Sequence, residues 1–237
     1  MRLFMFPFAG GSARVYKPFE KYLDLKEVET ILIEYKGHGA RSGEAFYENI
    51  EACATDVLAQ IKGQIQEEPY ALFGHSMGGI IIYELVKQIE EQGLRYPSHI
   101  FISGRRAPHF KQRKDYFIYK LPEKEFIEEV QVAGGLDEII LRDETLKNYF
   151  LPIIRSDYRL IEEYKIVGER NHFKCNMTLC YATEDLEATK EDVLAWKEYG
   201  DKYIEVFEFE GGHFYFKEDP ATLCNIINNT LYTYNHD

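Results

Sequence analysis

The chain has 237 residues, of which 45% are hydrophobic and 29% charged, and its formal net charge is −12. These values indicate one globular domain, or one domain with an insertion, and they exclude a disordered chain. The negative charge argues against nucleic acid and anionic membrane surfaces as partners. We also expect no membrane span, because every apolar run is shorter than the roughly 20 residues that cross a bilayer.

The first residues and the cysteines indicate the cellular compartment of the protein. The segment "MRLFMFPFAGG" runs straight into glycines, so we interpret it as a buried strand and not as a secretory signal. The cysteines are Cys53, Cys175, Cys180 and Cys224, and they show neither a CxxC pair nor a metal-ligand spacing. We therefore expect a reduced, cytoplasmic protein with core thiols and no metal site.

Short apolar runs alternate with longer amphipathic stretches along the chain. The predicted strands are 3–6, 30–34, 70–73, 100–103, 177–181 and 204–209. The predicted helices are 50–66, 77–92, 190–199 and 220–232. This alternation is typical of an α/β fold with a mostly parallel sheet and helices on both faces.

The segment 114–174 breaks this alternation. It contains no convincing strand and reads as short helices separated by Gly134-Gly135. Such an insertion between two strands often forms a lid over an active site. We therefore expect an α/β core of residues 1–113 and 175–237, with a helical lid at 114–174. Its apolar residues are expected to line or close a pocket, among them Phe126, Val130, Ile139, Ile140 and Phe150.

The sequence "GHSMG", residues 74–78, fits the G-x-S-x-G nucleophile elbow. It lies between a predicted strand and a predicted amphipathic helix, which is the context that this motif requires. The glycines permit a turn too sharp for side chains, and the helix N-terminus favours a developing negative charge. We therefore predict that Ser76 is a nucleophile, the alternative being a structural turn that happens to contain serine.

A nucleophilic serine needs a base and an acid, which in α/β hydrolases follow it in the order acid, then histidine. The chain has seven histidines, and His213 alone follows the last predicted strand on a glycine loop. Asp185 follows the preceding strand, where it would orient the imidazole and stabilise its cationic form. A helix cap or a solvated loop charge is the alternative for Asp185, and Glu184 and Glu187 stand beside it.

The tetrahedral intermediate of such an enzyme needs hydrogen-bond donors at its oxyanion. One is expected from the backbone N–H of Met77, the residue after the nucleophile. The other is expected from Phe8 or Ala9 in the loop "FPFAGGS" after the first strand. A phosphate-binding loop is the alternative for this Gly-Gly, but the loop lacks both GxGxxG and the Walker lysine.

With these residues in place, the chain resembles the type II (external) thioesterases of nonribosomal peptide and polyketide synthesis. The resemblance runs from about residue 3 to residue 232. It rests on the ordered set "FPFAGGSARVYKPF", "GHGARSGE", "PYALFGHSMGG", "ISGRRAPH", "FLPIIRSDYRLIEEYK" and "FEGGHFYF". Two departures are Lys36, where the family usually has proline, and the absence of a glycine that often precedes the acid.

The resemblance implies an α/β-hydrolase fold with a helical lid and a triad of Ser76, Asp185 and His213. It also implies hydrolysis of acyl, aminoacyl or peptidyl thioesters from the 4'-phosphopantetheine arm of carrier proteins, in an editing or regenerating role. That arm belongs to the substrate, so no cofactor is expected. The implied partners are acyl or peptidyl carrier domains of a synthetase, and we expect the enzyme to be a monomer. The acyl group and the pathway stay open.

Other readings of the same residues remain. One is a soluble carboxylesterase that acts on small oxygen esters, and another is a non-catalytic binding protein that keeps the fold. A third is acyl transfer instead of hydrolysis, because water and an acceptor alcohol attack the same acyl-enzyme.

A run of basic residues in this acidic chain predicts a docking surface. The run "RRAPHFKQRK" contains Arg105, Arg106, Lys111, Arg113 and Lys114, and no acidic residue. It begins at the carboxyl end of a predicted strand, on the edge of the sheet that carries the elbow. Carrier proteins are, as the family implies, usually acidic, so a basic rim would attract them. The alternative is a solvated loop whose charges only aid solubility.

Overall fold

A computed structural model describes residues 1–110 and 113–236, and it contains one six-stranded sheet. The strand order is β2-β1-β3-β4-β5-β6, and every pair is parallel. The strands are β1 (Arg2–Phe6), β2 (Glu29–Leu32), β3 (Tyr70–His75), β4 (His99–Ser103), β5 (Asn176–Ala182) and β6 (Ile204–Phe209). The predicted parallel sheet is therefore confirmed, with strand ends shifted by at most two residues.

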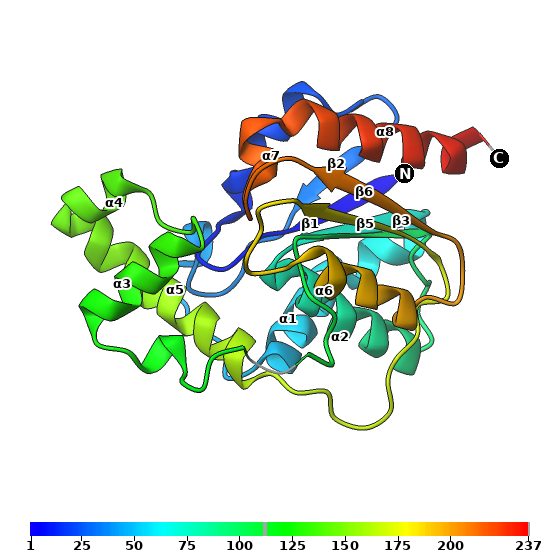
Figure 1. The fold of residues 1–237 in the computed structure, drawn as a ribbon. Helices are drawn as coiled ribbons and strands as arrows, with labels where there is room; N and C mark the ends of the chain where they lie inside the picture. Colours follow the sequence, from blue (N-terminus) through cyan, green and yellow to red (C-terminus); the bar gives the residue numbers. More distant parts are fainter. Residues whose placement is uncertain (111–112, 237) are drawn as a thin grey trace.

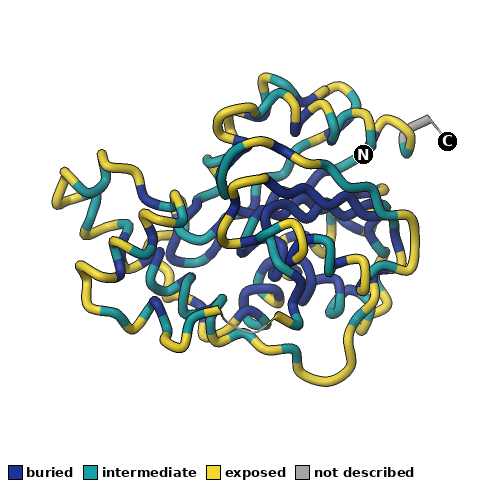
Figure 2. The backbone as a smooth tube through the Cα atoms, in the orientation of Figure 1, coloured by how far each residue is buried: buried dark blue, intermediate teal, exposed yellow. Residues whose placement is uncertain are grey.

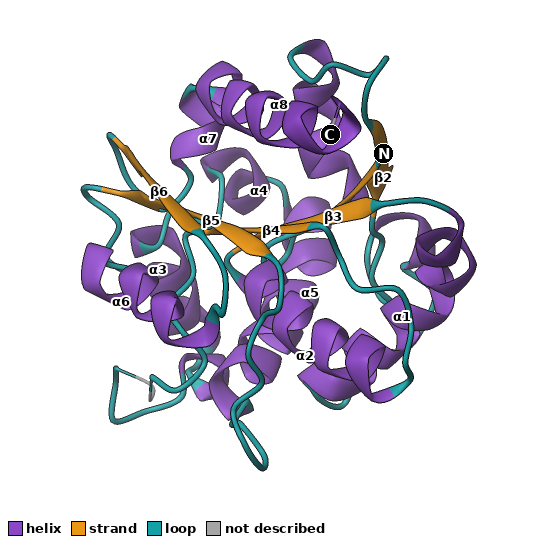
Figure 3. Ribbon diagram, turned by 90° about the vertical axis from the view of Figure 1, so that its right-hand side faces the viewer, coloured by secondary structure: helices purple, strands orange, loops and turns teal. Residues whose placement is uncertain are grey.

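Helices cover both faces of the sheet (Figure 3). On one face lie α1 (Ile50–Glu67), α2 (Met77–Glu91) and α6 (Lys190–Leu194), and on the other lie α7 (Tyr215–Glu218) and α8 (Pro220–His236). The strands β1, β3 and β4 are almost wholly buried, as expected for parallel strands between two helical layers. One core cluster lies on each side of the sheet, and Figure 2 shows these strands as the buried centre of the molecule.

Two stretches differ from the sequence prediction. The predicted helix 190–199 ends as α-helix at Leu194 and continues as a 3₁₀ helix, Ala195–Tyr199. A second 3₁₀ helix, Ala13–Lys21, was not predicted; it contains Pro18, which removes a backbone donor. Its Tyr16 and Phe19 are buried against the sheet. Tertiary packing therefore holds this segment, and it shows no long helical periodicity in the sequence.

The segment between β4 and β5 is helical and projects from one end of the sheet (Figure 1). It holds a 3₁₀ turn (Ile118–Lys120) and the helices α3 (Glu123–Val132), α4 (Glu138–Arg142) and α5 (Glu144–Glu163). These helices share a small apolar cluster of their own, separate from the two clusters of the sheet. Gly134, with φ +73°, lies in the connection between α3 and α4.

The helix α5 is fixed to the sheet domain by polar contacts. Arg159 donates to the backbone oxygens of Tyr47 (2.6 Å) and Glu48 (3.1 Å). Just beyond the helix end, the Tyr164 hydroxyl donates to Glu84 Oε1 on α2 at 2.6 Å. The inserted segment is thus held at α5, while α3 and α4 extend farther from the sheet (Figure 1).

Across the described residues, we find no helix with the length and apolar character that a membrane span requires.

Candidate active site

Ser76 lies in a sharp turn between β3 and α2. Its backbone has φ +53° and ψ −116°, and it is the one non-glycine residue with positive φ in the part of the chain that the structure describes. Such a conformation costs on the order of 1–3 kcal/mol and persists only where surrounding contacts hold it. One such contact is the Ser76 N–H, which donates to the Ser103 carbonyl oxygen at 2.9 Å.

The glycines on either side of Ser76 are required by close backbone packing. A Cβ atom on Gly74 would lie 2.5 Å from the carbonyl carbon of Gly78. A Cβ atom on Gly78 would lie 2.4 Å from the carbonyl oxygen of Phe6, at the end of β1. Both contacts involve backbone atoms, which cannot rotate away. The turn can therefore form between β1, β3 and α2 only with glycine at both positions.

Asp185 and His213 come together from two loops at the carboxyl end of the sheet. Asp185 follows β5, His213 follows β6, and Oδ2 of Asp185 lies 2.8 Å from Nδ1 of His213. Because an ionised carboxylate only accepts, Nδ1 carries the hydrogen and Nε2 is the basic atom of the ring. The other carboxylate oxygen accepts from the backbone N–H groups of Glu187 (2.8 Å) and Ala188 (3.0 Å).

Burial separates Asp185 from the acidic residue beside it. The Asp185 side chain is 0% exposed and that of His213 is 8% exposed, whereas Glu184 is an exposed residue. Asp185 therefore accepts from three donors in a buried position, and those donors fix the direction of its carboxylate. This arrangement can hold an imidazole in one tautomer and one orientation.

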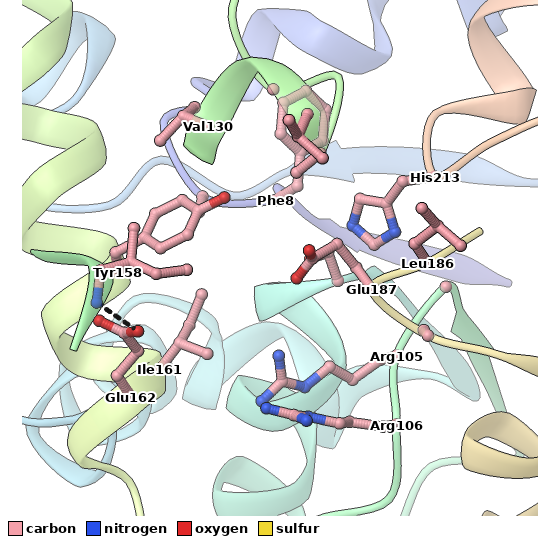
Figure 4. Close-up of a pocket in the computed structure, with 18 of the residues that line it drawn as sticks. Phe8, Arg105, Arg106, Val130, Tyr158, Ile161, Glu162, Leu186, Glu187 and His213 are labelled. Atoms are coloured by element: carbon pink, nitrogen blue, oxygen red, sulfur yellow. Dashed lines mark hydrogen bonds between the residues drawn. The ribbon is translucent and has the colours of Figure 1, made fainter. Parts of the chain in front are cut away.

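Ser76 and His213 line the same cavity, of about 340 Å³, under the inserted helices. Figure 4 shows His213, Leu186 and Glu187 on one side and Val130, Tyr158 and Ile161 of the insertion on the other. The wall also includes Phe8, Ala9, Ile118, Ile154 and Phe214. A mostly apolar cavity with a few converging polar groups is the usual form of a small-molecule site.

The residues predicted to supply backbone donors lie at or beside this cavity. Phe8 and Ala9 follow β1 and line the cavity beside Ser76. Met77 is the first residue of α2, so its N–H has no partner within the helix. The loop after β1 therefore lines the cavity, and Met77 directly follows the cavity residue Ser76 at the start of α2.

The family model for the thioesterase domain matches residues 1–231. The chain belongs to the thioesterase family. It is similar to the gramicidin S biosynthesis protein GrsT of Aneurinibacillus migulanus, with 31% identity over 228 residues, which are 96% of this chain and 87% of that protein. The predicted thioesterase family and serine-hydrolase class are therefore confirmed.

Solved structures agree with this assignment. The thioesterase RedJ from the prodiginine biosynthetic pathway in Streptomyces coelicolor is 30% identical with a TM-score of 0.88, and the match covers 97% of this chain and 89% of that one. ClbQ from the colibactin NRPS/PKS pathway is 27% identical with a TM-score of 0.91, and the match covers 98% and 97% of the two chains. The predicted α/β-hydrolase fold is confirmed.

In this thioesterase, His75 has a structural position. It is fully buried, and its Nδ1 lies 2.9 Å from the Ser103 hydroxyl. Burial, together with the neighbouring ionisable groups of His213 and Lys217, holds the pKa of His75 well below its usual value. The ring is therefore neutral at physiological pH and packs behind His213, with 4.8 Å between the ring centroids.

The basic run divides into two pairs around the cavity, and Lys111 lies outside the described residues. Arg105 and Arg106 line the cavity with their guanidinium groups side by side (Figure 4), and burial lowers the pKa of Arg105 to about 9. Arg113 and Lys114 also line the cavity. Each of these two is paired with a carboxylate, Arg113 with Asp192 and Lys114 with Glu129.

The inserted helices contribute other residues to the cavity than the sequence predicted. Of the five apolar residues expected there, Val130 lines it. Phe126 is buried in the insertion's own cluster, against which Ile140 and Phe150 pack. Ile139 is exposed. The helical periodicity of the sequence does not show which apolar residues face the sheet and which pack against the neighbouring inserted helices.

One pair of residues near the site was missed from the sequence. His38 Nε2 lies 2.8 Å from Asp157 Oδ2, although the two residues are 119 positions apart. The sequence assigns no role to either residue: Asp157 lies within the helical segment 114–174, and His38 is one of the six histidines other than His213. An aspartate on the otherwise buried face of α5 is the signal that could have drawn attention to it.

Proposed function

We propose that this enzyme hydrolyses acyl, aminoacyl or peptidyl thioesters through a triad of Ser76, His213 and Asp185. The observation that carries the proposal is the 2.8 Å contact between His213 and a buried, three-fold hydrogen-bonded Asp185, at a cavity that the strained Ser76 also lines. Strain at a residue of this type is characteristic of a functional position. The order of the three residues in the chain is that of α/β hydrolases.

The reaction has two halves. His213 Nε2 takes the proton of the Ser76 hydroxyl while Oγ attacks the thioester carbonyl carbon. The negative charge that develops on the carbonyl oxygen is stabilised by the backbone N–H of Met77 and that of Phe8 or Ala9. The carbon–sulfur bond then breaks, and the thiolate leaves with the proton held by His213. In the second half, water activated by the same imidazole releases the acyl group as an acid.

The proposed substrate is an acyl group on the 4'-phosphopantetheine arm of a carrier protein. This proposal is supported by relatives whose names place them in gramicidin S, prodiginine and colibactin biosynthesis. The role would be editing or regenerating a nonribosomal peptide or polyketide synthetase. The enzyme needs no cofactor of its own in this reaction, because the arm is part of the substrate. We propose that the segment 114–174 is the lid that admits it.

A panel of acyl-loaded carrier proteins tests this function, with release followed by mass spectrometry. Each acyl group is also offered as a pantetheine thioester and as the matching oxygen ester. We expect faster release from the carrier than from the oxygen ester, and free acid as the product. Faster turnover of the oxygen ester would identify a carboxylesterase, and transfer to an added alcohol would identify an acyltransferase. Failure to react with a fluorophosphonate would identify a non-catalytic binding protein.

We further propose that the basic run guides the acidic carrier to the cavity. Because Arg113 and Lys114 already have carboxylate partners, their reversal would disrupt those pairs. We therefore change Arg106, which lines the cavity, and Lys111, which lies outside the described residues. Each reversal to glutamate is expected to raise KM for the acyl-carrier several-fold and to weaken its salt dependence, since steering between opposite charges is screened by salt.

The control for this test is Lys62→Glu, which makes the same change in net charge on α1. An uncharged acyl thioester serves as the second substrate. For Lys111→Glu we expect unchanged turnover of that small substrate. Equal losses on both substrates, or equal losses in the Lys62 control, would contradict docking at the basic run.

A further inference from the structure

A buried ion pair connects the insertion with the loop after β2. Asp157 on α5 and His38 are each about 2% exposed, and Asp157 Oδ2 lies 2.8 Å from His38 Nε2. The other ring nitrogen of His38, Nδ1, lies 2.9 Å from the carbonyl oxygen of Lys36. Both ring nitrogens therefore face acceptors. Since a neutral imidazole has only one N–H, the ring is protonated here.

The environment agrees with a charged ring. Burial by itself lowers the pKa of His38, but the hydrogen bond and the charge of Asp157 outweigh it and raise that pKa above its usual value. A buried charge that loses its partner is strongly unfavourable. The imidazolium therefore fixes the Asp157 carboxylate in place, and the Lys36 carbonyl fixes the imidazolium.

The same carboxylate oxygen holds the loop that follows β1. The Gly10 N–H donates to Asp157 Oδ2 at 2.7 Å. Gly10 has φ +79°, and a Cβ atom there would lie 2.6 Å from Cγ1 of Ile154, one turn earlier on α5. The loop therefore packs directly on α5 and is hydrogen-bonded to it. The bonded peptide is the one that joins Ala9 to Gly10, next to the backbone N–H groups of Phe8 and Ala9.

We propose that Asp157 and His38 are positioning residues for the oxyanion loop, residues 8–11. In this arrangement α5 does more than cover the cavity, since it sets the direction of the backbone donors that stabilise the oxyanion. The proposal rests on the proposed function, because it assigns a role within that reaction. A shift of about 1 Å in such donors is enough to lower the rate on the order of a hundredfold.

Three variants separate positioning from simple anchoring of α5. Asp157→Ala removes the acceptor of the Gly10 N–H. Asp157→Asn is the conservative variant, because its amide oxygen can still accept from Gly10. Arg159→Ala is the matched control on the same helix: it removes the bonds to Tyr47 and Glu48 but none to the oxyanion loop. Thermal unfolding of each variant shows whether it is folded.

The measurements are kcat and KM on an acyl-carrier substrate and the affinity for a boronic acid, which forms a tetrahedral adduct that uses the oxyanion hole. For Asp157→Ala we expect kcat to fall on the order of a hundredfold, KM to change little, and boronate affinity to fall in parallel with kcat/KM. Asp157→Asn should recover at least about a tenth of the wild-type kcat, and Arg159→Ala should stay within a few-fold of wild type.

Three results would overturn the proposal. One is an equal loss of kcat in Arg159→Ala, which would make general anchoring of α5 the cause. Another is an increase in KM alone for Asp157→Ala, with kcat and boronate affinity unchanged. The third is full activity in a folded Asp157→Ala. A wild-type enzyme inactive on every acyl-carrier would instead refute the proposed function, so the two failures are distinguishable. Should Asp157→Ala not fold, His38→Ala, which leaves the carboxylate without its cation, is measured in the same way.

Discussion

Asp185 differs from its acidic neighbours by what its carboxylate contacts. It is buried and accepts from His213 and from two backbone N–H groups. Replacing it with asparagine would put an amide where only an acceptor fits, so the imidazole would take the wrong tautomer or turn away. We expect Asp185→Asn to lower kcat on the order of 10⁴-fold, the size known for this change in serine proteases.

The control for this prediction is Glu184→Gln, on the adjacent exposed side chain. We expect its kcat to stay close to that of the wild type under the same steady-state assay. A severe loss in Glu184→Gln together with a mild one in Asp185→Asn would reassign the acid.

The residues of the proposed triad could be predicted because each follows a strand of a parallel sheet. The carboxyl ends of such strands meet at one edge, so order along the chain already brings residues 76, 185 and 213 together. The pair of His38 and Asp157 could not be predicted in this way. It joins a loop to the middle of an inserted helix, and the direction in which that helix lies against the sheet domain is not encoded in any local pattern.

At the scale of elements, the inserted segment divides into a fixed part and an outlying part. The helix α5 is bound to the sheet domain through Asp157, Arg159 and the adjoining Tyr164. The helices α3 and α4 pack mainly within the insertion, and α4 has no buried residue. If the segment is a lid, α3 and α4 are the parts that can move while α5 stays in place.

Hydrogen exchange tests this division. We expect amides of α3 and α4 to exchange faster than those of α5, and amides of β1, β3 and β4 to exchange most slowly, because protection follows the free energy of local opening. Uniform protection across α3, α4 and the sheet would contradict a mobile cover. Exchange in α5 as fast as in α3 would contradict its role as the fixed part.

The sequence predicted the strands from short apolar runs, and the helices α1, α2 and α8 from amphipathic stretches, but it read the 20-residue helix α5 only as part of a series of short helices. The 3₁₀ helices Ala13–Lys21 and Ala195–Tyr199 were not predicted, because their backbone geometry depends on contacts with residues distant in the sequence. The 3₁₀ helix Ala13–Lys21 is held by two aromatic side chains that pack on the sheet. The change from α-helix to 3₁₀ helix after Leu194 is likewise not marked by glycine or proline.

At the scale of the whole molecule, three buried histidines contribute to the pH dependence of stability. Burial keeps the pKa of His75 well below its usual value and lowers that of His99 to about 4. Below about pH 6.5 the unfolded chain therefore binds protons that the folded protein does not, and stability falls as the pH falls. His38 acts in the opposite direction. Its raised pKa gives stability that is complete below about pH 6.5 and is lost as the pH rises through the folded value.

Taken together, these histidines favour the folded protein most near pH 6.5. Urea unfolding across pH 4 to 9 checks this, with an acid-side slope of up to about 1.4 kcal/mol per pH unit for each buried neutral histidine. His99→Gln should reduce the slope on the acid side alone, and His38→Gln should reduce it on the alkaline side alone. A stability that rises steadily from pH 6.5 down to pH 4 would contradict these assignments.

The central claim is that Ser76 receives the acyl group from a carrier protein. The most direct test is to mix the enzyme with an acyl-loaded carrier, quench within milliseconds to seconds, and locate the added mass by peptide mass spectrometry. We expect an acyl adduct on the peptide that contains Ser76. The Ser76→Ala variant should remain folded, form no adduct and release no acid. An adduct on any other residue, or continued release of the acid by folded Ser76→Ala, would contradict the account.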